Sequence, residues 1–202
     1  MTNNNKMQIE WIKKQVKDSI ETKKKVMEDI VILKQINKIV YEVCCSLKDG
    51  NKIIFAGNGG SFADAQHLSA EFVSRFRIDR DPLSSVVLGA NNSAISAIGN
   101  DYGYDRVFSR ELQAIYKKGD VYIPITTSGN SLNIINSVEF AKRNNIKTFG
   151  FTGQGGGLLK NLCECVCIPS TDTARIQECH IMIGHILCEL VENYFITIKN
   201  KC

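Results

Sequence analysis

Long apolar runs are absent from this 202-residue sequence. No segment reaches the length needed to span a membrane, and the opening MTNNNKMQIEW has no signal-peptide core. We therefore expect a cytoplasmic protein with no membrane partner. Internal repeats, low-complexity segments and interdomain linkers are absent as well. Because 44% of the residues are hydrophobic and 23% are charged, we expect a single globular domain over residues 1–202.

A strong excess of one charge is missing too. The sequence has 25 basic and 21 acidic residues, which gives a net charge of +4. Much of the excess lies in one run near the start, KKQVKDSIETKKK. We interpret this run as the solvent-exposed face of a helix, and we expect no nucleic-acid partner.

Eight cysteines are present, but their spacings do not form the paired CxxC motifs of a zinc site. In a reducing compartment we expect them to be buried as small hydrophobic side chains. Cys163, Cys165 and Cys167 alternate along the chain, so we expect the three thiols to face one side of a β-strand.

The spacing of the apolar residues predicts a doubly wound α/β fold. Apolar residues recur three and four apart over residues 8–47 without Pro or Gly, which predicts two helices in an N-terminal extension, 1–48. In the remaining core, 49–202, helical patterns alternate with five short apolar runs: KIIFAG, SSVVLG, DVYIPIT, KTFGFTG and CVCIP. Such runs suit strands buried on both faces and predict a five-stranded parallel sheet of the flavodoxin-like class. A last long helix is expected over residues 173–194.

The first predicted strand ends in a glycine-rich loop that suits an anion. Asn58, Gly59, Gly60 and Ser61 follow this strand and precede a helical pattern. Ligand sites of open parallel sheets lie at such carboxyl ends of strands. The start of a helix offers unpaired N–H groups and the positive end of its dipole, and the glycines allow a phosphate to approach the backbone.

A second loop of the same kind follows the predicted strand DVYIPIT. It offers the hydroxyls of Thr126, Thr127, Ser128 and Ser131, which together with backbone N–H groups can surround a phosphate. Neither loop has the Gly-Lys-Ser/Thr of a Walker motif or a GxGxxG pattern, so the two loops favour a phosphorylated small molecule over a nucleotide. The structural alternative is that each hydroxyl only caps a helix.

Groups able to transfer protons lie in two of the predicted helices. His67 and Glu71 are four residues apart and share one helix face, while Gln177, His180 and His185 interrupt the last apolar pattern. A carboxylate that removes a proton beside a carbonyl, with an imidazole acting on the oxygens, predicts aldose–ketose isomerisation through an enediol or enediolate. Two His, a Glu and a Gln could also bind zinc, which would polarise the carbonyl.

Two structural alternatives apply to these residues. His180 could be a hydrogen-bonded residue of the core, and His67 and Glu71 could form a pair that serves structure only.

Four motifs of the chain resemble the sugar isomerase (SIS) family, in particular its phosphoheptose isomerase branch. They are AGNGGSFADAQHLSAEF, IGNDYGYDRVFSRELQA, TTSGNS and ARIQECHIMIGHILCELVE, and the resemblance covers about residues 10–197. It implies an SIS fold and conversion of D-sedoheptulose 7-phosphate to D-glycero-D-manno-heptose 7-phosphate. This reaction is the first step towards activated heptose for lipopolysaccharide or capsule. It also implies a homotetramer whose sites are completed across subunit interfaces and whose N-terminal helices pack in the oligomer.

The resemblance also implies a role for individual residues. Glu71 matches the base and His185 its acid partner. One zinc ion per subunit would be bound by His67, Glu71, Gln177 and His185. The substrate would be bound by Asn58, Gly59, Gly60, Ser61, Asp101, Thr126, Thr127, Ser128, Ser131, Asp172 and Gln177. Thr126 and Phe62 depart from the residues most common in the family, although Thr126 keeps the hydroxyl.

Two further interpretations belong to different functional classes. One is a non-catalytic SIS-fold scaffold that binds the replication initiator, and the other is an SIS enzyme that acts on another phosphosugar. The presence of His67, Glu71, Gln177 and His185 favours an enzyme over the scaffold.

Overall fold

The computed structural model describes residues 3–199 and contains a five-stranded parallel sheet. Its strand order is β2-β1-β3-β4-β5, which is the flavodoxin-like order. The strands are β1 (Ile53–Gly57), β2 (Ser85–Val87), β3 (Val121–Ile125), β4 (Lys147–Thr152) and β5 (Glu164–Cys167). The predicted fold class is confirmed, and each strand falls on one of the five apolar runs.

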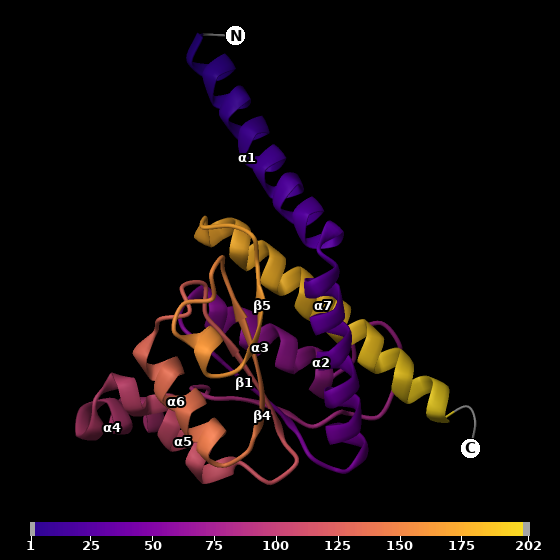
Figure 1. Cartoon of the computed structure of the whole chain (residues 1–202), viewed down its shortest axis with the longest axis vertical. Helices are drawn as coiled ribbons and strands as arrows, with labels where there is room; N and C mark the ends of the chain where they lie inside the picture. The colour runs from indigo at the N-terminus through magenta and orange to yellow at the C-terminus, as the bar shows by residue number, and fades with distance from the viewer. Residues whose placement is uncertain (1–2, 200–202) are drawn as a thin grey trace.

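Helices cover both faces of this sheet (Figure 1). In chain order they are α1 (Asn3–Glu28), α2 (Ile30–Lys48), α3 (Gly60–Val73), α4 (Asn92–Tyr102), α5 (Val107–Ile115), α6 (Leu132–Arg143) and α7 (Thr173–Lys199). Two short 3₁₀ helices are η1 (Tyr104–Arg106) and η2 (Leu159–Asn161). The predicted last helix is confirmed and continues beyond residue 194.

Alternation along the strands produces two hydrophobic clusters. Phe55 of β1 points into the cluster formed with α2, α3 and α7, whereas Ile54 points into the cluster formed with α5 and α6. Every residue of β1 and β3 is buried, as expected for strands covered on both faces. The buried strands form a rigid base for the loops at their carboxyl ends.

The N-terminal extension consists of the two expected helices, which meet at Asp29. The Asp29 carboxylate accepts hydrogen bonds from the backbone N–H groups of Val31 (2.8 Å) and Ile32 (3.2 Å) and so caps α2. Helix α1 contacts the first part of α7, where Ser19 donates to Glu178. Figure 1 shows the rest of α1 projecting beyond the body of the molecule.

The cysteines behave as small apolar residues. Four of the seven described thiols are buried and three are half-buried, and all seven are free. Cys163, Cys165 and Cys167 contact the same hydrophobic cluster, as their alternation predicted. Cys202 lies outside the described residues. Within residues 3–199, no helix is both long and apolar enough to cross a membrane.

The strand order brings two of the predicted site loops to the same edge of the sheet. From β1 the chain continues to β2 on one side of it, and then returns to β3 on the other side. Ligands of open α/β sheets bind where the chain changes direction in this way. The loops after β1 and β3, which contain the predicted phosphate-binding residues, therefore border one crevice.

Candidate active site

The loop after β1 leads directly into α3. Gly59 takes the N-cap position with φ of +54°, and no side chain bonds to the first turn of the helix. Ser61 is buried, and its backbone N–H donates to the carbonyl of Asn58 (3.0 Å). Because no side chain caps α3, its first turn can accept an anion from outside.

The loop after β3 presents hydroxyls that are not consumed by helix capping. Ser131 takes the N-cap position of α6, yet its side chain makes no capping bond. Its Oγ lies 3.3 Å from Oγ1 of the buried Thr126. Ser128 Oγ accepts from the backbone N–H of Asn130 (3.1 Å), and Thr127 is half-buried. The capping alternative therefore does not hold for Ser131 or for the start of α3.

A third loop, 153–157 after β4, supports the second one and was missed by sequence reasoning. Gly153 N–H donates to the carbonyl of Thr127 (3.0 Å), and Leu159 N–H donates to the carbonyl of Gly129 (3.0 Å). Gly129 has a φ of +68°, and a Cβ there would collide with the carbonyl of Gly156. Only glycine fits this contact. The glycine run QGGG was the available signal.

A pair of amides joins the loop after β1 to the first turn of α6, which follows the second loop. Asn58 and Asn133 exchange two hydrogen bonds, each 2.9 Å from Nδ2 to Oδ1. The hydroxyl of Tyr104 donates to Asn58 Oδ1 (3.2 Å). Sequence reasoning predicted Asn58 but missed Asn133 and Tyr104. The amide pair therefore ties the first loop to the start of α6.

The side chains expected to transfer protons meet between α3 and α7. His67 Nε2 lies 2.8 Å from His185 Nε2 and 3.4 Å from Glu71 Oε1. Burial lowers the pKa of His185, and the neighbouring His67 lowers it further, whereas Glu71 raises it. The i, i+4 spacing of His67 and Glu71 was readable from the sequence, but the approach of His185 depends on helix packing.

Gln177 lies at the first loop. A Cβ on Gly60 would be 2.5 Å from Gln177 Nε2, so the side-chain amide of Gln177 covers the start of α3. Three of the four predicted zinc ligands therefore come together, whereas the side chain of the fourth, Gln177, lies against Gly60 of the first loop.

The two predicted aspartates differ in position. Asp172 Oδ1 accepts from the backbone N–H groups of Ala174 (2.8 Å) and Arg175 (3.4 Å) and so caps α7 near Gln177. Asp101 is exposed on α4, where it accepts from the side chain of Asn100. No described contact brings Asp101 to either loop.

Two other titratable residues lie near the site. His180 is fully buried, its Nε2 lies 3.2 Å from the carbonyl of Thr152, and burial lowers its pKa to about 4. The interpretation of His180 as a core residue is thus confirmed. Asp64 of α3, which sequence reasoning missed, has a buried Oδ2 without a hydrogen-bond partner, and burial raises its pKa to about 6.

The donor types near His67 suit zinc, but their spacing is tight. Imidazole nitrogen and carboxylate oxygen are common zinc ligands, and at bonds near 2.0–2.1 Å two tetrahedral ligands stand about 3.3 Å apart. The 2.8 Å between the two Nε2 atoms is shorter by about half an ångström. Among residues 3–199, no group of three or more His, Cys, Asp or Glu side chains is arranged to hold a metal. Small torsional adjustments of the two rings would remove the difference.

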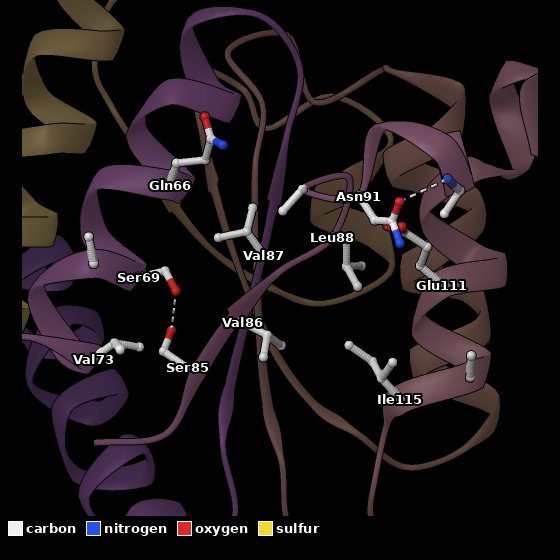
Figure 2. A pocket seen from close by; sticks show the side chains of 14 residues that line it. Gln66, Ser69, Val73, Ser85, Val86, Val87, Leu88, Asn91, Glu111 and Ile115 are labelled. Carbon is white, nitrogen blue, oxygen red and sulfur yellow. Dashed lines mark hydrogen bonds between the residues drawn. The ribbon is translucent and has the colours of Figure 1, made fainter. Parts of the chain in front are cut away.

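A cavity of about 730 Å³ lies elsewhere, along the edge strand β2 between α3 and α5. Figure 2 shows Gln66 and Val73 on one wall, and Glu111 and Ile115 on the other. Glu111 accepts a hydrogen bond from the backbone N–H of Gly89. Large apolar pockets are common ligand sites, but this one contains neither of the polar loops nor the two facing histidines. We therefore place the candidate active site at the crevice between β1 and β3.

Comparison with known proteins identifies the family that this chain resembles. A family model described as SIS domain matches residues 16–153. Phosphoheptose isomerase 2 from Campylobacter jejuni subsp. jejuni serotype O:2 is 49% identical over 183 residues, which are 90% of this chain and 91% of that protein. The structure of phosphoheptose isomerase GmhA from Neisseria gonorrhoeae is 34% identical, with a TM-score of 0.85, over 91% of this chain and 98% of its own. The structure of a phosphoheptose isomerase from Francisella tularensis is 31% identical, with a TM-score of 0.87, over 96% of this chain and 100% of its own.

Proposed function

Since this chain belongs to the SIS domain family, we propose that it is an aldose–ketose isomerase that converts D-sedoheptulose 7-phosphate to D-glycero-D-manno-heptose 7-phosphate. The relatives that match nearly its whole length are named phosphoheptose isomerases. The observation that carries the proposal is that His67 and Glu71, on the helix that starts at the glycine-rich loop, meet His185 of α7. The product supplies activated heptose for lipopolysaccharide or capsule.

The distance along α3 suits a long sugar phosphorylated at one end. His67 follows Gly60 by seven residues, so it lies about 10 Å further along the helix axis. A phosphate at the start of α3 therefore leaves the carbonyl end of the sugar beside the histidines. Ser61 and the hydroxyls of Thr126, Thr127, Ser128 and Ser131 surround the phosphate, together with backbone N–H groups.

The chemical step is a proton transfer between neighbouring carbons. The Glu71 carboxylate removes a proton from C1 of the ketose, and the electron pair forms the C1–C2 double bond of an enediolate. His185 gives a proton to the oxygen on C2 and, in the return step, receives one from the oxygen on C1. Glu71 then delivers its proton to C2, which completes the aldose. Because the proton on the base can exchange with solvent, C2 acquires solvent hydrogen.

A zinc ion bound by His67, Glu71, Gln177 and His185 is part of the proposal. The donor types support it, and the ion would supply Lewis-acid polarisation of the carbonyl. Metal analysis of the purified protein should find one zinc per subunit. The variant His67→Gln, with one ligand weakened, should contain less zinc at equal free metal concentration. Equal zinc in both proteins would argue against this ligand set.

Assembly into a homotetramer in the cytoplasm completes the proposal. Large apolar side chains of α1, among them Ile12, Val16 and Ile20, are more than half exposed and share one helix face. Such a face suits packing against helices of other subunits. The free thiols suit the reducing cytoplasm.

The experiment that tests the function is NMR of the protein with sedoheptulose 7-phosphate in D₂O. We expect new aldoheptose signals with deuterium at C2, because the base exchanges its proton with solvent. Saturable binding without turnover would overturn the assignment in favour of another phosphosugar or of a scaffold.

A further inference from the structure

A buried ion pair lies beside the proposed catalytic residues without being one of them. It links α3, which contains Glu71, to α7, which contains His185. Arg80, in the loop after α3, and Glu192, on α7, have side chains that are 5% and 2% exposed. Arg80 Nε lies 3.3 Å from Glu192 Oε1. Buried charges of this kind persist only where further hydrogen bonds compensate for lost hydration. The further hydrogen bonds of Arg80 and Glu192 show which backbone segments the ion pair holds in place.

Arg80 holds the end of α3. Its Nη2 donates to the carbonyl of Glu71 (2.8 Å), and its Nη1 donates to the carbonyls of Phe72 (2.9 Å) and Asp81 (3.0 Å). The last carbonyls of a helix have no partner within the helix. The guanidinium therefore fixes the final turn of α3 at the residue that acts as the base.

Glu192 holds the loop that follows α3. Its carboxylate accepts from the backbone N–H groups of Phe76 (2.9 Å), Arg77 (2.8 Å) and Ile78 (3.2 Å). Burial raises the pKa of Glu192, but these three N–H groups and Arg80 together lower it below its ordinary value. A carboxylate with two oxygens can accept all three bonds, whereas an amide has only one accepting oxygen.

The loop held in this way places an aromatic ring against His185. The centroids of the Phe76 and His185 rings are 5.6 Å apart, with an angle of 30° between their planes. Glu192 follows His185 by seven residues, about two helical turns, so both lie on one face of α7. The Glu192 carboxylate thus fixes the loop that contains Phe76, and the Phe76 ring packs against the imidazole of His185.

We propose that Arg80 and Glu192 are positioning residues, which fix the Glu71 end of α3 and press the Phe76 ring against His185. Both side chains are buried, so we assign neither a contact with the substrate. This inference rests on the proposed isomerase function, because its value lies in holding the base and acid partner in register. A displacement of about 1 Å in such groups lowers turnover by up to about a hundredfold.

The test compares two carboxylate-to-amide changes on the same helix. Glu192→Gln removes acceptors from the loop, whereas the control Glu189→Gln removes only the exposed ion pair with Arg77, whose Nη2 lies 3.3 Å from Glu189 Oε2. We expect Glu192→Gln to lower kcat by about 10- to 100-fold, with KM changed less than about threefold, because ground-state binding at the distant loops persists. Glu189→Gln should retain the kcat of the unchanged protein.

Two measurements report on the positioning independently of turnover. Amide hydrogen exchange at residues 76–78 should accelerate by about tenfold or more in Glu192→Gln but not in Glu189→Gln. The His185 ring resonances, which sense the Phe76 ring, should move in Glu192→Gln and also in Phe76→Leu. Free exchange at residues 76–78 with unchanged kcat and unchanged His185 resonances would overturn the inference.

Two further outcomes are covered by the same design. If Glu192→Gln does not fold, Phe76→Leu carries the test, and an unchanged kcat in that variant overturns the role of the ring. If the unchanged protein does not isomerise sedoheptulose 7-phosphate, the proposed function fails. The exchange rates and His185 resonances then still decide whether the pair positions the ring.

Discussion

Glu71 and His185 approach the same point from two helices that are more than one hundred residues apart in sequence. Their proposed roles rest on side-chain atoms alone, because Glu71 follows Gly60 by eleven residues and so lies about 16 Å along α3 from the predicted phosphate-binding loop. At this scale, a change of one functional group should affect the proton transfers without affecting phosphate binding.

The first prediction concerns these two groups. Glu71→Gln and His185→Gln should each lower kcat by about 10²- to 10⁴-fold, because each removes an acid–base group. The KM for sedoheptulose 7-phosphate should change little. Steady-state kinetics beside the exposed control Glu139→Gln would show this, and near-normal turnover in both variants would contradict the assigned roles.

His180 yields a prediction about stability and pH. Burial lowers its pKa to about 4, and the bond to the Thr152 carbonyl only partly opposes this. In the unfolded chain the imidazole takes up a proton near pH 6.5. The unfolded state therefore binds more protons between these values, and the contribution of His180 to stability, present above pH 6.5, falls as the pH drops towards 4. The loss reaches about 3 kcal/mol.

Urea unfolding of the protein and of His180→Gln from pH 7.5 to 4.5 measures this loss. We expect the free energy of unfolding to fall more steeply with decreasing pH in the unchanged protein than in the variant. Parallel curves would show that His180 does not titrate on unfolding.

At the scale of elements, loops from neighbouring strands brace one another at the carboxyl edge of the sheet. The loop after β3 contacts the loop after β4 through backbone hydrogen bonds and a glycine contact, and an amide pair joins the helix that follows it, α6, to the loop after β1. The position of the hydroxyls in the loop after β3 thus depends on contacts with neighbouring segments as well as on the conformation of that loop.

A pair of glycine variants tests this bracing. Gly129 and Gly155 both have positive φ, but a Cβ at Gly129 meets the carbonyl of Gly156, whereas a Cβ at Gly155 meets nothing within 4 Å. Gly155→Ala should cost about 1 kcal/mol from backbone strain alone. Gly129→Ala should cost more and raise KM, because the second loop must move. Equal stability and KM in the two variants would contradict the role of the contact.

At the scale of the whole molecule, α1 has two apolar faces. One contains the buried Val26, which belongs to the hydrophobic cluster that also includes residues of α7, and the other presents Ile12, Val16 and Ile20 to solvent. Exposed apolar stripes on a projecting helix are typical of subunit interfaces.

Charge placed on this stripe should therefore disrupt the proposed tetramer. The double variant Ile12→Lys/Ile20→Lys introduces two charges that cannot be buried between subunits. The control Glu10→Lys/Glu21→Lys places the same residues on the polar face of α1. Light scattering after size-exclusion chromatography should give a smaller particle for the first variant only. An unchanged mass in the first variant would exclude this stripe from the interface.

Much of this architecture could be predicted because it depends on local pattern. Apolar periodicity and β-branched runs specify helices and buried strands within windows of a few residues, so the elements and the parallel sheet followed from them. The positions of the two polar loops were readable because glycine and hydroxyl residues follow strands directly; their binding of phosphate stays a prediction. The spacing of His67 and Glu71 was readable because four residues bring two side chains together on any helix.

Other features were decided only by the tertiary structure, since they join segments distant in the chain. Asn133 and Asn58 are separated by 75 residues, and Glu192 and Phe76 by 116. The pairing of such residues depends on how helices pack across a sheet, and no local pattern contains that information. By itself the sequence determined which elements form and which residues can act chemically. Packing decided which of those residues meet, because hydrogen bonds and ring contacts require atoms within a few ångströms of each other.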